Sequence, residues 1–296
     1  MNTKQGLFWL KIAAFAFFLH ANVAYAINLN EFFPGLKPDI DGRIETLNNK
    51  GGMAPQATGA EIWLLADLKT QYNENTRLLE IGPAFGRMPV ELFSNDFQGN
   101  YTAIDLSTEH LDYLRKSLQK FPEAKDSIKL ITGEFPQASK QLAAGSFDII
   151  LATHVFHFFT PKQFDAAVDE LWRLLAPGGK VYITVKTPYS QRYNKFIPVY
   201  LERKRKSAAH PGYIDNVGYW VDPTTIAPER LQKLYGLHLY FFGKEDLKKI
   251  FVQHKFKIAR CEEVALGYES PIWQAPKAYA DREDAVILAI KPKKNG

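Results

Sequence analysis

The segment RLLEIGPAFG at residues 77–86 decides how the rest of the chain is expected to fold. It opens with a short apolar run, Arg77 to Ile81, which predicts a buried strand. It closes with Gly82, Ala84 and Gly86, whose small size lets the backbone turn sharply and a ligand approach closely. Residues 87–93 then predict a helix, whose first N–H groups favour a carboxylate or phosphate. We therefore expect a strand–turn–helix unit with a ligand at the turn.

The same alternation of strands and helices continues on both sides of this segment. Continuous apolar strands between amphipathic helices predict an α/β fold, with a Rossmann-like, mostly parallel sheet covered by helices on both faces. The expected strands are 77–81, 101–105, 128–132, 147–153, 180–185, 256–264 and 285–290, and the expected helices are 61–72, 87–93, 108–119, 161–175 and 244–254.

The composition sets limits on the class of protein. The 296 residues are 46% hydrophobic and 23% charged, which excludes a disordered or collagen-like chain and leaves room for one large domain or two. A single cysteine, Cys261, excludes an intrachain disulfide framework and any cysteine-clustered metal site. The formal net charge of +5 is a mild basic bias, and no stretch resembles a nucleic-acid-binding module.

Polar residues follow the next two expected strands. Asp105 ends the second strand, and Thr132, Gly133 and Glu134 end the third. Ligands bind outside the carboxyl ends of the strands in an open parallel sheet, and a carboxylate there can accept hydrogen bonds from both hydroxyls of a ribose. A nicotinamide dinucleotide fingerprint needs a third glycine where Arg87 stands, which argues against that ligand.

Four motifs resemble those of class I S-adenosylmethionine-dependent methyltransferases. The spacing acid-x-Gly-x-small-x-Gly at residues 80–86 resembles the first motif, and GEFP at 133–136 resembles the adenine-side loop. Residues 145–157 (GSFDIILATHVFH) resemble the fourth-strand motif, and residues 171–180 (LWRLLAPGGK) resemble the approach to the fifth strand. They occur in the family's order, so the resemblance implies a seven-stranded sheet with an antiparallel last strand and S-adenosyl-L-methionine as cofactor.

The resemblance also implies which residues bind the cofactor. They are Glu80, Gly82, Ala84 and Gly86 around the methionine part, Asp105 at the ribose with Leu106 beside it, and Glu134 with Phe135 at the adenine. Glu80 and Glu134 stand where the family commonly has Asp, and Ala84 replaces the middle glycine, but carboxylate and small size are kept. Structural roles stay open: Glu80 could cap the following turn, Asp105 could cap the next helix, and Glu134 could be solvated.

Two histidines follow the fourth expected strand. His154 is the candidate catalytic residue, as a general base or as part of the wall of the donor pocket. The spacing of His154 and His157 also permits metal binding, but no third ligand is evident, so no metal site is predicted. A packed, hydrogen-bonded histidine is the alternative at either position.

Residues 1–26 have the pattern of a secretory signal peptide. They combine a basic start, an apolar run at 12–19 and an AYA triplet at 24–26. We therefore expect cleavage and export to a periplasm or the exterior. The alternative is a membrane anchor over residues 7–26, although Lys11 interrupts that stretch.

The remaining chain divides by composition into four parts. We expect an N-terminal arm or lid at 27–59, the cofactor-binding core at 60–187, an insertion at 188–243, and a C-terminal helix with closing strands at 244–296. The insertion holds 11 aromatic residues, and eight Lys or Arg against four Asp or Glu. Such a segment at the ligand rim predicts a cap over the acceptor site, suited to an anionic or aromatic acceptor.

The expected partner is therefore a methyl acceptor, which is a small molecule, a lipid or a protein. The basic and aromatic insertion is also compatible with peripheral contact with a membrane surface. The competing hypothesis is a non-catalytic nucleoside-binding module on the same fold. The sequence does not identify the acceptor or the oligomeric state.

Overall fold

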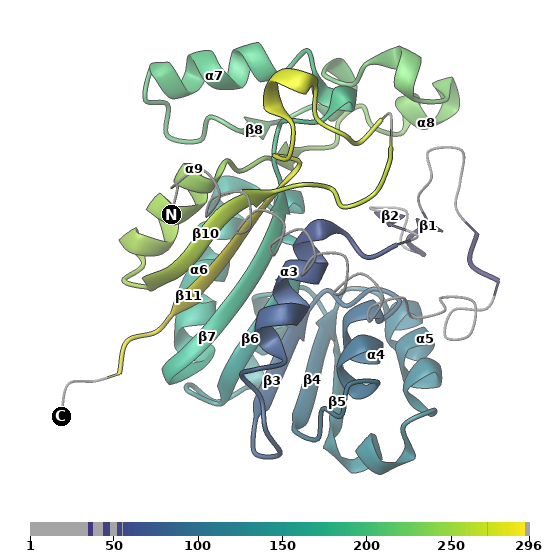
Figure 1. The fold of residues 1–296 in the computed structure, drawn as a ribbon, viewed down its shortest axis with the longest axis vertical. Helices are drawn as coiled ribbons and strands as arrows, with labels where there is room; N and C mark the ends of the chain where they lie inside the picture. The colour runs from purple at the N-terminus through teal and green to yellow at the C-terminus, as the bar shows by residue number, and fades with distance from the viewer. Residues whose placement is uncertain (1–34, 38–43, 48–51, 55, 271, 294–296) are drawn as a thin grey trace, which may run out of the picture.

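The computed structural model describes residues 35–37, 44–47, 52–54, 56–270 and 272–293 (Figure 1). The expected signal peptide, residues 1–26, and much of the expected arm lie outside this part. Within the described arm, β1 (Ile44–Glu45) pairs with β2 (Gly52–Met53) in an antiparallel manner. No helix among the described residues has the length and apolar character needed to cross a membrane.

A seven-stranded sheet in the order β10-β11-β7-β6-β3-β4-β5 forms the centre of the molecule. The strands β3 to β7 are parallel, and β11 runs antiparallel to both of its neighbours. The strands are β3 (Arg77–Ile81), β4 (Asn100–Asp105), β5 (Ile128–Thr132), β6 (Phe147–Thr153), β7 (Leu175–Lys186), β10 (Lys257–Val264) and β11 (Asp284–Ile290). The predicted Rossmann-like α/β fold with an antiparallel last strand is confirmed.

Both faces of the sheet are buried, because alternate side chains of each strand point to opposite faces. Leu78 and Tyr101 pack under one helical layer, whereas Leu79 and Ile104 pack under the other. The first layer, turned towards the viewer in Figure 1, contains α3 (Gly59–Leu68), α4 (Arg87–Phe93) and α5 (Thr108–Leu118), and the second contains α6 (Pro161–Leu174) and α9 (Lys244–Gln253).

Several boundaries differ from the sequence expectation, most of all those of α3, which ends at Leu68 rather than at residue 72, and of β7. Helix α3 begins at Gly59, two residues before the expected start, because Thr58 and Glu61 form a reciprocal capping box. Strand β7 begins at Leu175 rather than at residue 180, and its register against β6 shifts over the intervening residues. Gly178 adopts a φ of 85° there, so the Pro-Gly-Gly turn is incorporated in the strand as an irregularity.

The order of the strands places a topological switch between β3 and β6. From β3 the chain runs outward to β4 and β5, and it then returns to the other side of β3 with β6. Ligand crevices form at such a switch, outside the carboxyl ends of the strands. In Figure 1 the cap lies beyond these carboxyl ends.

The cap has a hydrophobic core of its own, built from residues 188–243. It contains α7 (Ile197–Arg205), α8 (Pro228–Gln232) and a small hairpin of β8 (Tyr213–Ile214) with β9 (Leu239–Tyr240). The connection between β10 and β11 also joins it, a contribution that the sequence did not predict. The Tyr279 ring from this connection stacks on Tyr189 at 4.9 Å, and the Gln191 N–H donates to the Gln274 carbonyl.

Candidate cofactor and acceptor site

Hydrogen bonds join the loops that follow β3, β4 and β5 into one continuous rim. The Gly82 N–H donates to the Ile104 carbonyl at 2.8 Å, and the Gly133 N–H donates to the Asp105 carbonyl at 2.8 Å. The Ala84 N–H donates to Asp105 Oδ2 at 3.1 Å. The structure therefore brings together the three loops in which the sequence places the cofactor-binding residues.

The glycines of the first loop are required by conformation and by packing. Gly82 and Gly86 have φ values of 68° and 93°, in the left-handed region that L residues rarely adopt. A Cβ on Gly82 would lie 2.5 Å from Val155 Cγ2, and one on Gly86 would lie 2.4 Å from Leu114 Cδ1. Ala84 also adopts a positive φ, 50°, and its hydrogen bond to Asp105 holds the loop there.

Asp105 supports the rim from within and is only 6% exposed. In addition to the Ala84 bond, its Oδ1 accepts the Ser107 N–H at 2.9 Å and faces His110 Nδ1 at 3.1 Å. Asp105 therefore supports the start of α5, which is the structural role that the sequence left open. It also links α5 to the first loop. Leu106, the next residue, is 47% exposed and offers an apolar surface on the rim.

His110 connects this rim to the N-terminal arm. The Leu47 N–H donates to His110 Nε2 at 3.0 Å, so Nε2 acts as an acceptor and Nδ1 carries the proton shared with Asp105. The sequence indicated an arm or lid at 27–59, but nothing in it singled out His110.

Glu80 lies inside the buried face of the sheet rather than on the rim. It is almost fully buried, and Tyr101 Oη donates to its Oε2 at 2.6 Å. Burial, aided by the charges of Asp105 and Glu61, raises the pKa of Glu80 to about 8 against the lowering effect of the Tyr101 hydrogen bond. Glu80 is therefore mainly protonated at neutral pH.

The adenine-side residues separate into one exposed and one buried side chain. Glu134 is exposed, and its Oε1 faces Gln163 Nε2 at 3.4 Å. Phe135 is buried in the core, where its ring lies 6.2 Å from the Phe156 ring. Of the two, Glu134 is the side chain that solvent and a ligand can reach.

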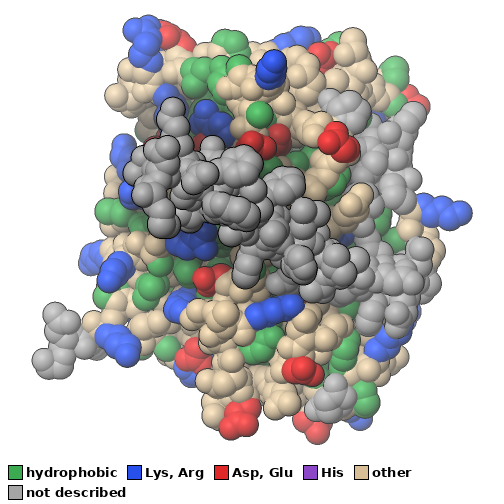
Figure 2. Space-filling view, viewed as in Figure 1, with side chains coloured by type: hydrophobic (Ala, Val, Ile, Leu, Met, Phe, Trp, Pro, Cys, Tyr) green, Lys and Arg blue, Asp and Glu red, His purple; other side chains and the backbone are tan. Residues whose placement is uncertain are grey.

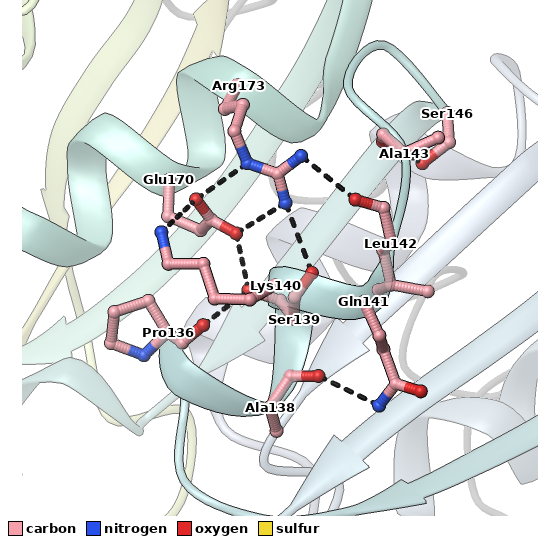
Figure 3. Close-up of polar contacts among 10 residues, drawn as sticks. All are labelled: Pro136, Ala138, Ser139, Lys140, Gln141, Leu142, Ala143, Ser146, Glu170 and Arg173. Atoms are coloured by element: carbon pink, nitrogen blue, oxygen red, sulfur yellow. Dashed lines mark hydrogen bonds and ion pairs between the residues drawn. The ribbon is translucent and has the colours of Figure 1, made fainter.

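A polar network anchors the rest of that loop to α6, as Figure 3 shows. The buried carboxylate of Glu170 accepts hydrogen bonds from Arg173, from Lys140 Nζ at 2.9 Å and from Ser139 Oγ at 2.6 Å. Arg173 also donates to the carbonyls of Leu142 and Ser139. The position of the loop after β5 is therefore fixed by charge-assisted hydrogen bonds.

His154 stands at the carboxyl end of β6, next to the switch point. Its φ is 53°, and its N–H donates to the Thr184 carbonyl at 2.9 Å. Its Nε2 lies 3.2 Å from Oδ2 of the buried Asp284. The ring of His157 is 6.3 Å away from that of His154. No group of three His, Cys, Asp or Glu suited to a metal ion occurs in the described part of the chain.

Sequence reasoning missed Asp284 and its neighbour Lys186. Lys186 is the last residue of β7 and Asp284 is the first residue of β11, and a charged residue next to an apolar run is the signal that could have drawn attention to them. Their pairing across β7 and β11 depends on the antiparallel register, which brings them opposite each other.

Comparisons with known proteins agree with this geometry. Residues 79–183 match the family described as methyltransferase domain. A comparison with curated proteins gives no match.

Solved structures of low sequence identity share the fold. A SAM-dependent methyltransferase from Methanosarcina mazei is 17% identical, with a TM-score of 0.55 over 77% of this chain and 98% of that chain. The 1,6-didemethyltoxoflavin-N1-methyltransferase of Burkholderia thailandensis, solved with S-adenosylhomocysteine, is 15% identical, with a TM-score of 0.50 over 80% of each chain. The [4+2]-cyclase SpnF is 17% identical, with a TM-score of 0.53 over 90% of this chain and 91% of that chain.

The fold and the matched domain together define the class of protein. The chain contains a methyltransferase domain at residues 79–183 and has the fold of S-adenosylmethionine-dependent methyltransferases, which use S-adenosyl-L-methionine as cofactor. The family predicted from the four sequence motifs is thereby confirmed. The roles of individual site residues stay predictions.

Proposed function

We propose that this protein transfers a methyl group from S-adenosylmethionine, held on the rim of β3, β4 and β5, to an acceptor beneath the cap. The observation that carries this proposal is the joined rim within the matched domain, where Asp105 links the first glycine loop to the start of α5. The sulfonium of the cofactor supplies an already activated methyl group. The protein therefore needs mainly to align the donor with the acceptor and to exclude water.

The residues present fit this cofactor. Asp105 accepts three protein donors, and a carboxylate has about four acceptor positions, so capacity for a ribose hydroxyl remains. The exposed Leu106 provides an apolar surface next to that carboxylate for the adenine. Glu134 can accept from the adenine amino group, whereas Phe135 supports the loop from the core.

We propose an aromatic or anionic small molecule as the acceptor. The cap is rich in aromatic residues, and Tyr219 and Tyr235 are exposed, with their rings 5.4 Å apart. Among the coloured side chains on the face shown in Figure 2, basic and acidic ones are interspersed. A lipid headgroup or a protein side chain are the other acceptors that a product search would reveal.

Calorimetry on the full-length chain tests the proposal. S-adenosylmethionine and S-adenosylhomocysteine are expected to bind with micromolar affinity, and Asp105→Ala should abolish this binding. Asp148→Asn is the matched control, because Asp148 is paired with Arg77 at the opposite, amino-terminal ends of β6 and β3. If the folded protein binds neither compound, the competing hypothesis of a non-catalytic module is favoured. Tight binding of NADH would indicate an oxidoreductase instead.

Methyl transfer itself is tested with a labelled donor. Incubation of the protein and labelled S-adenosylmethionine with a cell extract should yield a labelled product that Asp105→Ala does not form. The product would also identify the acceptor.

We further propose that the protein is exported after cleavage behind Ala26. The support is the basic, apolar and AYA pattern of residues 1–26. N-terminal sequencing of periplasmic or secreted material should begin at Ile27. An intact Met1 in cytosolic material would refute this proposal.

A further inference from the structure

Strand β10 forms one edge of the central sheet, on the opposite side from β5 (Figure 1). Its inner edge pairs with β11. In the part of the chain that the structure describes, no strand or loop makes a backbone hydrogen bond to its outer edge. A strand with unpaired N–H and C=O groups along one edge is a template for another strand, and proteins usually protect such edges with charges or a bulge.

Both protective devices occur on β10, but its charges follow an order that a second copy of the strand would match. The register against β11 shifts between Ile258 and Arg260, and the strand is regular from Arg260 onward. In this regular part Arg260 Nη2 lies 2.7 Å from Glu262 Oε1, and both side chains are 45% exposed. A basic and an acidic side chain therefore alternate with Cys261 along an accessible strand edge.

The side chains of this segment lie on two different faces of the sheet. Arg260 extends over Trp63 of α3, with its guanidinium 4.9 Å from the ring, so Arg260 and its partner Glu262 lie on the α3 side. Cys261 packs on the α9 side, where its Sγ donates to the Lys244 carbonyl at 3.3 Å. Residues directly opposite each other in an antiparallel pair share a face, so Arg260 and Glu262 can meet the same two residues of a second copy.

One antiparallel register brings opposite charges together. When two copies of the strand are centred on Cys261, Arg260 of each copy lies opposite Glu262 of the other. A register centred on Arg260 or on Glu262 would instead place two like charges opposite each other, which destabilises a strand pair. The same charges that repel an unrelated strand therefore select a copy of β10 in the register centred on Cys261.

The opposite edge of the sheet lacks this property. Strand β5 carries a single charged residue, Lys129, and no acidic residue. No register of β5 with its own copy can therefore place opposite charges across the axis. The charge pattern distinguishes β10 as the edge that matches itself.

We propose that the outer edge of β10 is a docking surface for a second copy of this chain, related by a two-fold axis at Cys261, so that the two seven-stranded sheets join into one. Backbone hydrogen bonds between the two copies of β10 use groups that are unpaired in the single chain, and two symmetric pairs of Arg260 with Glu262 set the register. The strand order places β10 four positions away from β3, so the cofactor rim takes no part in this contact. The inference is independent of the proposed function.

Analytical ultracentrifugation of the full chain tests the association. The concentrations run from about 1 μM to about 500 μM, because a short interface with exposed ion pairs is weak. The wild type should shift from monomer to dimer over this range. Arg260→Glu and Glu262→Arg should each raise the dissociation constant of the dimer at least about tenfold, since each variant places two like-charge pairs across the axis. The double variant should return the constant to within about threefold of the wild type.

Urea unfolding at a monomeric concentration controls for the ion pair within each chain, and every variant should remain folded. A wild type that stays monomeric over the whole range, or reversals that leave its dissociation constant unchanged, would overturn the proposal. The exposed Tyr219 and Tyr235 offer a competing surface on the cap. If the double variant Tyr219→Ser with Tyr235→Ser abolishes the association, the contact lies on the cap and the proposal is likewise overturned.

The cysteine provides a second measurement that needs no charge reversal. Two copies centred on Cys261 have the Cβ atoms of this residue about 4.5 to 5.5 Å apart, within reach of a short bismaleimide. Because Cys261 is the single cysteine of the chain, any crosslinked dimer of the wild type joins these two positions. Cys261→Ser combined with Leu201→Cys is the matched control, since Leu201 is 38% exposed on α7 in the cap. The wild type should crosslink efficiently and the control poorly, whereas equal yields, or no dimer from the wild type, would contradict the register.

Discussion

Tyr101 donates a 2.6 Å hydrogen bond to Glu80 between two adjacent parallel strands, inside the buried face of the sheet. The bond stabilises the carboxylate, but burial outweighs it, and the pKa of Glu80 rises to about 8. The acid of the first motif therefore contributes a protonated carboxyl to the layer beneath the cofactor rim.

The raised pKa of Glu80 predicts a specific pH dependence of stability. The unfolded chain ionises this group near pH 4.5 and the folded chain near pH 8, so the contribution of Glu80 to stability falls as pH rises across that interval. Glu80→Gln removes this penalty, and its free energy of unfolding should exceed that of the wild type by about 4 kcal/mol at pH 8 but only about 1 kcal/mol at pH 5. Urea unfolding of both proteins at pH 8 and pH 5 measures this difference in free energy. An equal difference at the two pH values would contradict the raised pKa of Glu80.

The contact between Gly82 and Val155 predicts a packing effect at the first loop. Gly82→Ala should lower the free energy of unfolding by about 3 kcal/mol. The new Cβ would clash with Val155, and the alanine backbone would have to adopt a positive φ. Gly236→Ala is the matched control, since Gly236 also has a positive φ but open space around it, and should cost about 1 kcal/mol.

A double variant separates the clash from the conformational strain. Gly82→Ala combined with Val155→Ala should cost less than the sum of the two single variants in urea unfolding, because the shorter side chain makes room for the Cβ. Strict additivity would show that the two side chains do not interfere.

The Glu170 network predicts sensitivity to acid. Burial opposes ionisation, but the hydrogen bonds from Arg173, Lys140 and Ser139 hold the pKa of Glu170 at about 2. Its stabilisation is therefore present above about pH 4.5 and is lost as pH falls towards 2. Glu170→Gln should lower the free energy of unfolding by about 2 kcal/mol at pH 7 and much less at pH 2.5.

Lys140→Met is the control for that experiment. Lys140 is largely exposed, so losing its charge should cost under about 1 kcal/mol at either pH. Thermal unfolding at the two pH values compares the variants, and equal losses in both would refute a network centred on Glu170 and Arg173.

The bridge through His110 predicts coupling between the arm and the cofactor. His110→Phe removes the acceptor for the Leu47 N–H and a donor to Asp105, so S-adenosylhomocysteine should bind about tenfold more weakly, a loss of about 1.4 kcal/mol. His254→Asn is the control, because His254 pairs with the exposed Asp169 on α6, and it should leave the affinity unchanged. Calorimetry measures the affinity of each variant for S-adenosylhomocysteine. Equal affinities of the wild type, His110→Phe and His254→Asn would contradict the coupling between the arm and the cofactor.

The sequence predicted the strands of the core closely because each is a continuous apolar run ended by glycine or a polar residue. Strands β3, β5 and β6 have the predicted bounds. The start of α3 was missed because Thr58 and Glu61 form a capping box that outweighs the apolar spacing. Periodicity alone does not reveal such a side-chain contact.

The candidate site was predictable only where its residues are close in sequence. The glycine loop and Asp105 were predicted from motif spacing, and the structure joins them through the Ala84 N–H. The partners Asp284 and Lys186, like His110 and Leu47, are far apart in the chain and meet only through strand register or packing. Phe135 was placed on the rim by resemblance, whereas its apolar ring is buried in the core.

The two-part construction of the cap has a consequence for protein engineering. Tyr189 stacks on Tyr279, and Arg192 lies against Trp273 with its guanidinium 4.4 Å from the ring, so residues on both sides of α9 and β10 complete one hydrophobic core. Grafting this cap onto another scaffold therefore requires two separate segments, residues 188–243 and the connection between β10 and β11. A transplant of residues 188–243 alone would leave Tyr189 and Arg192 without these ring partners.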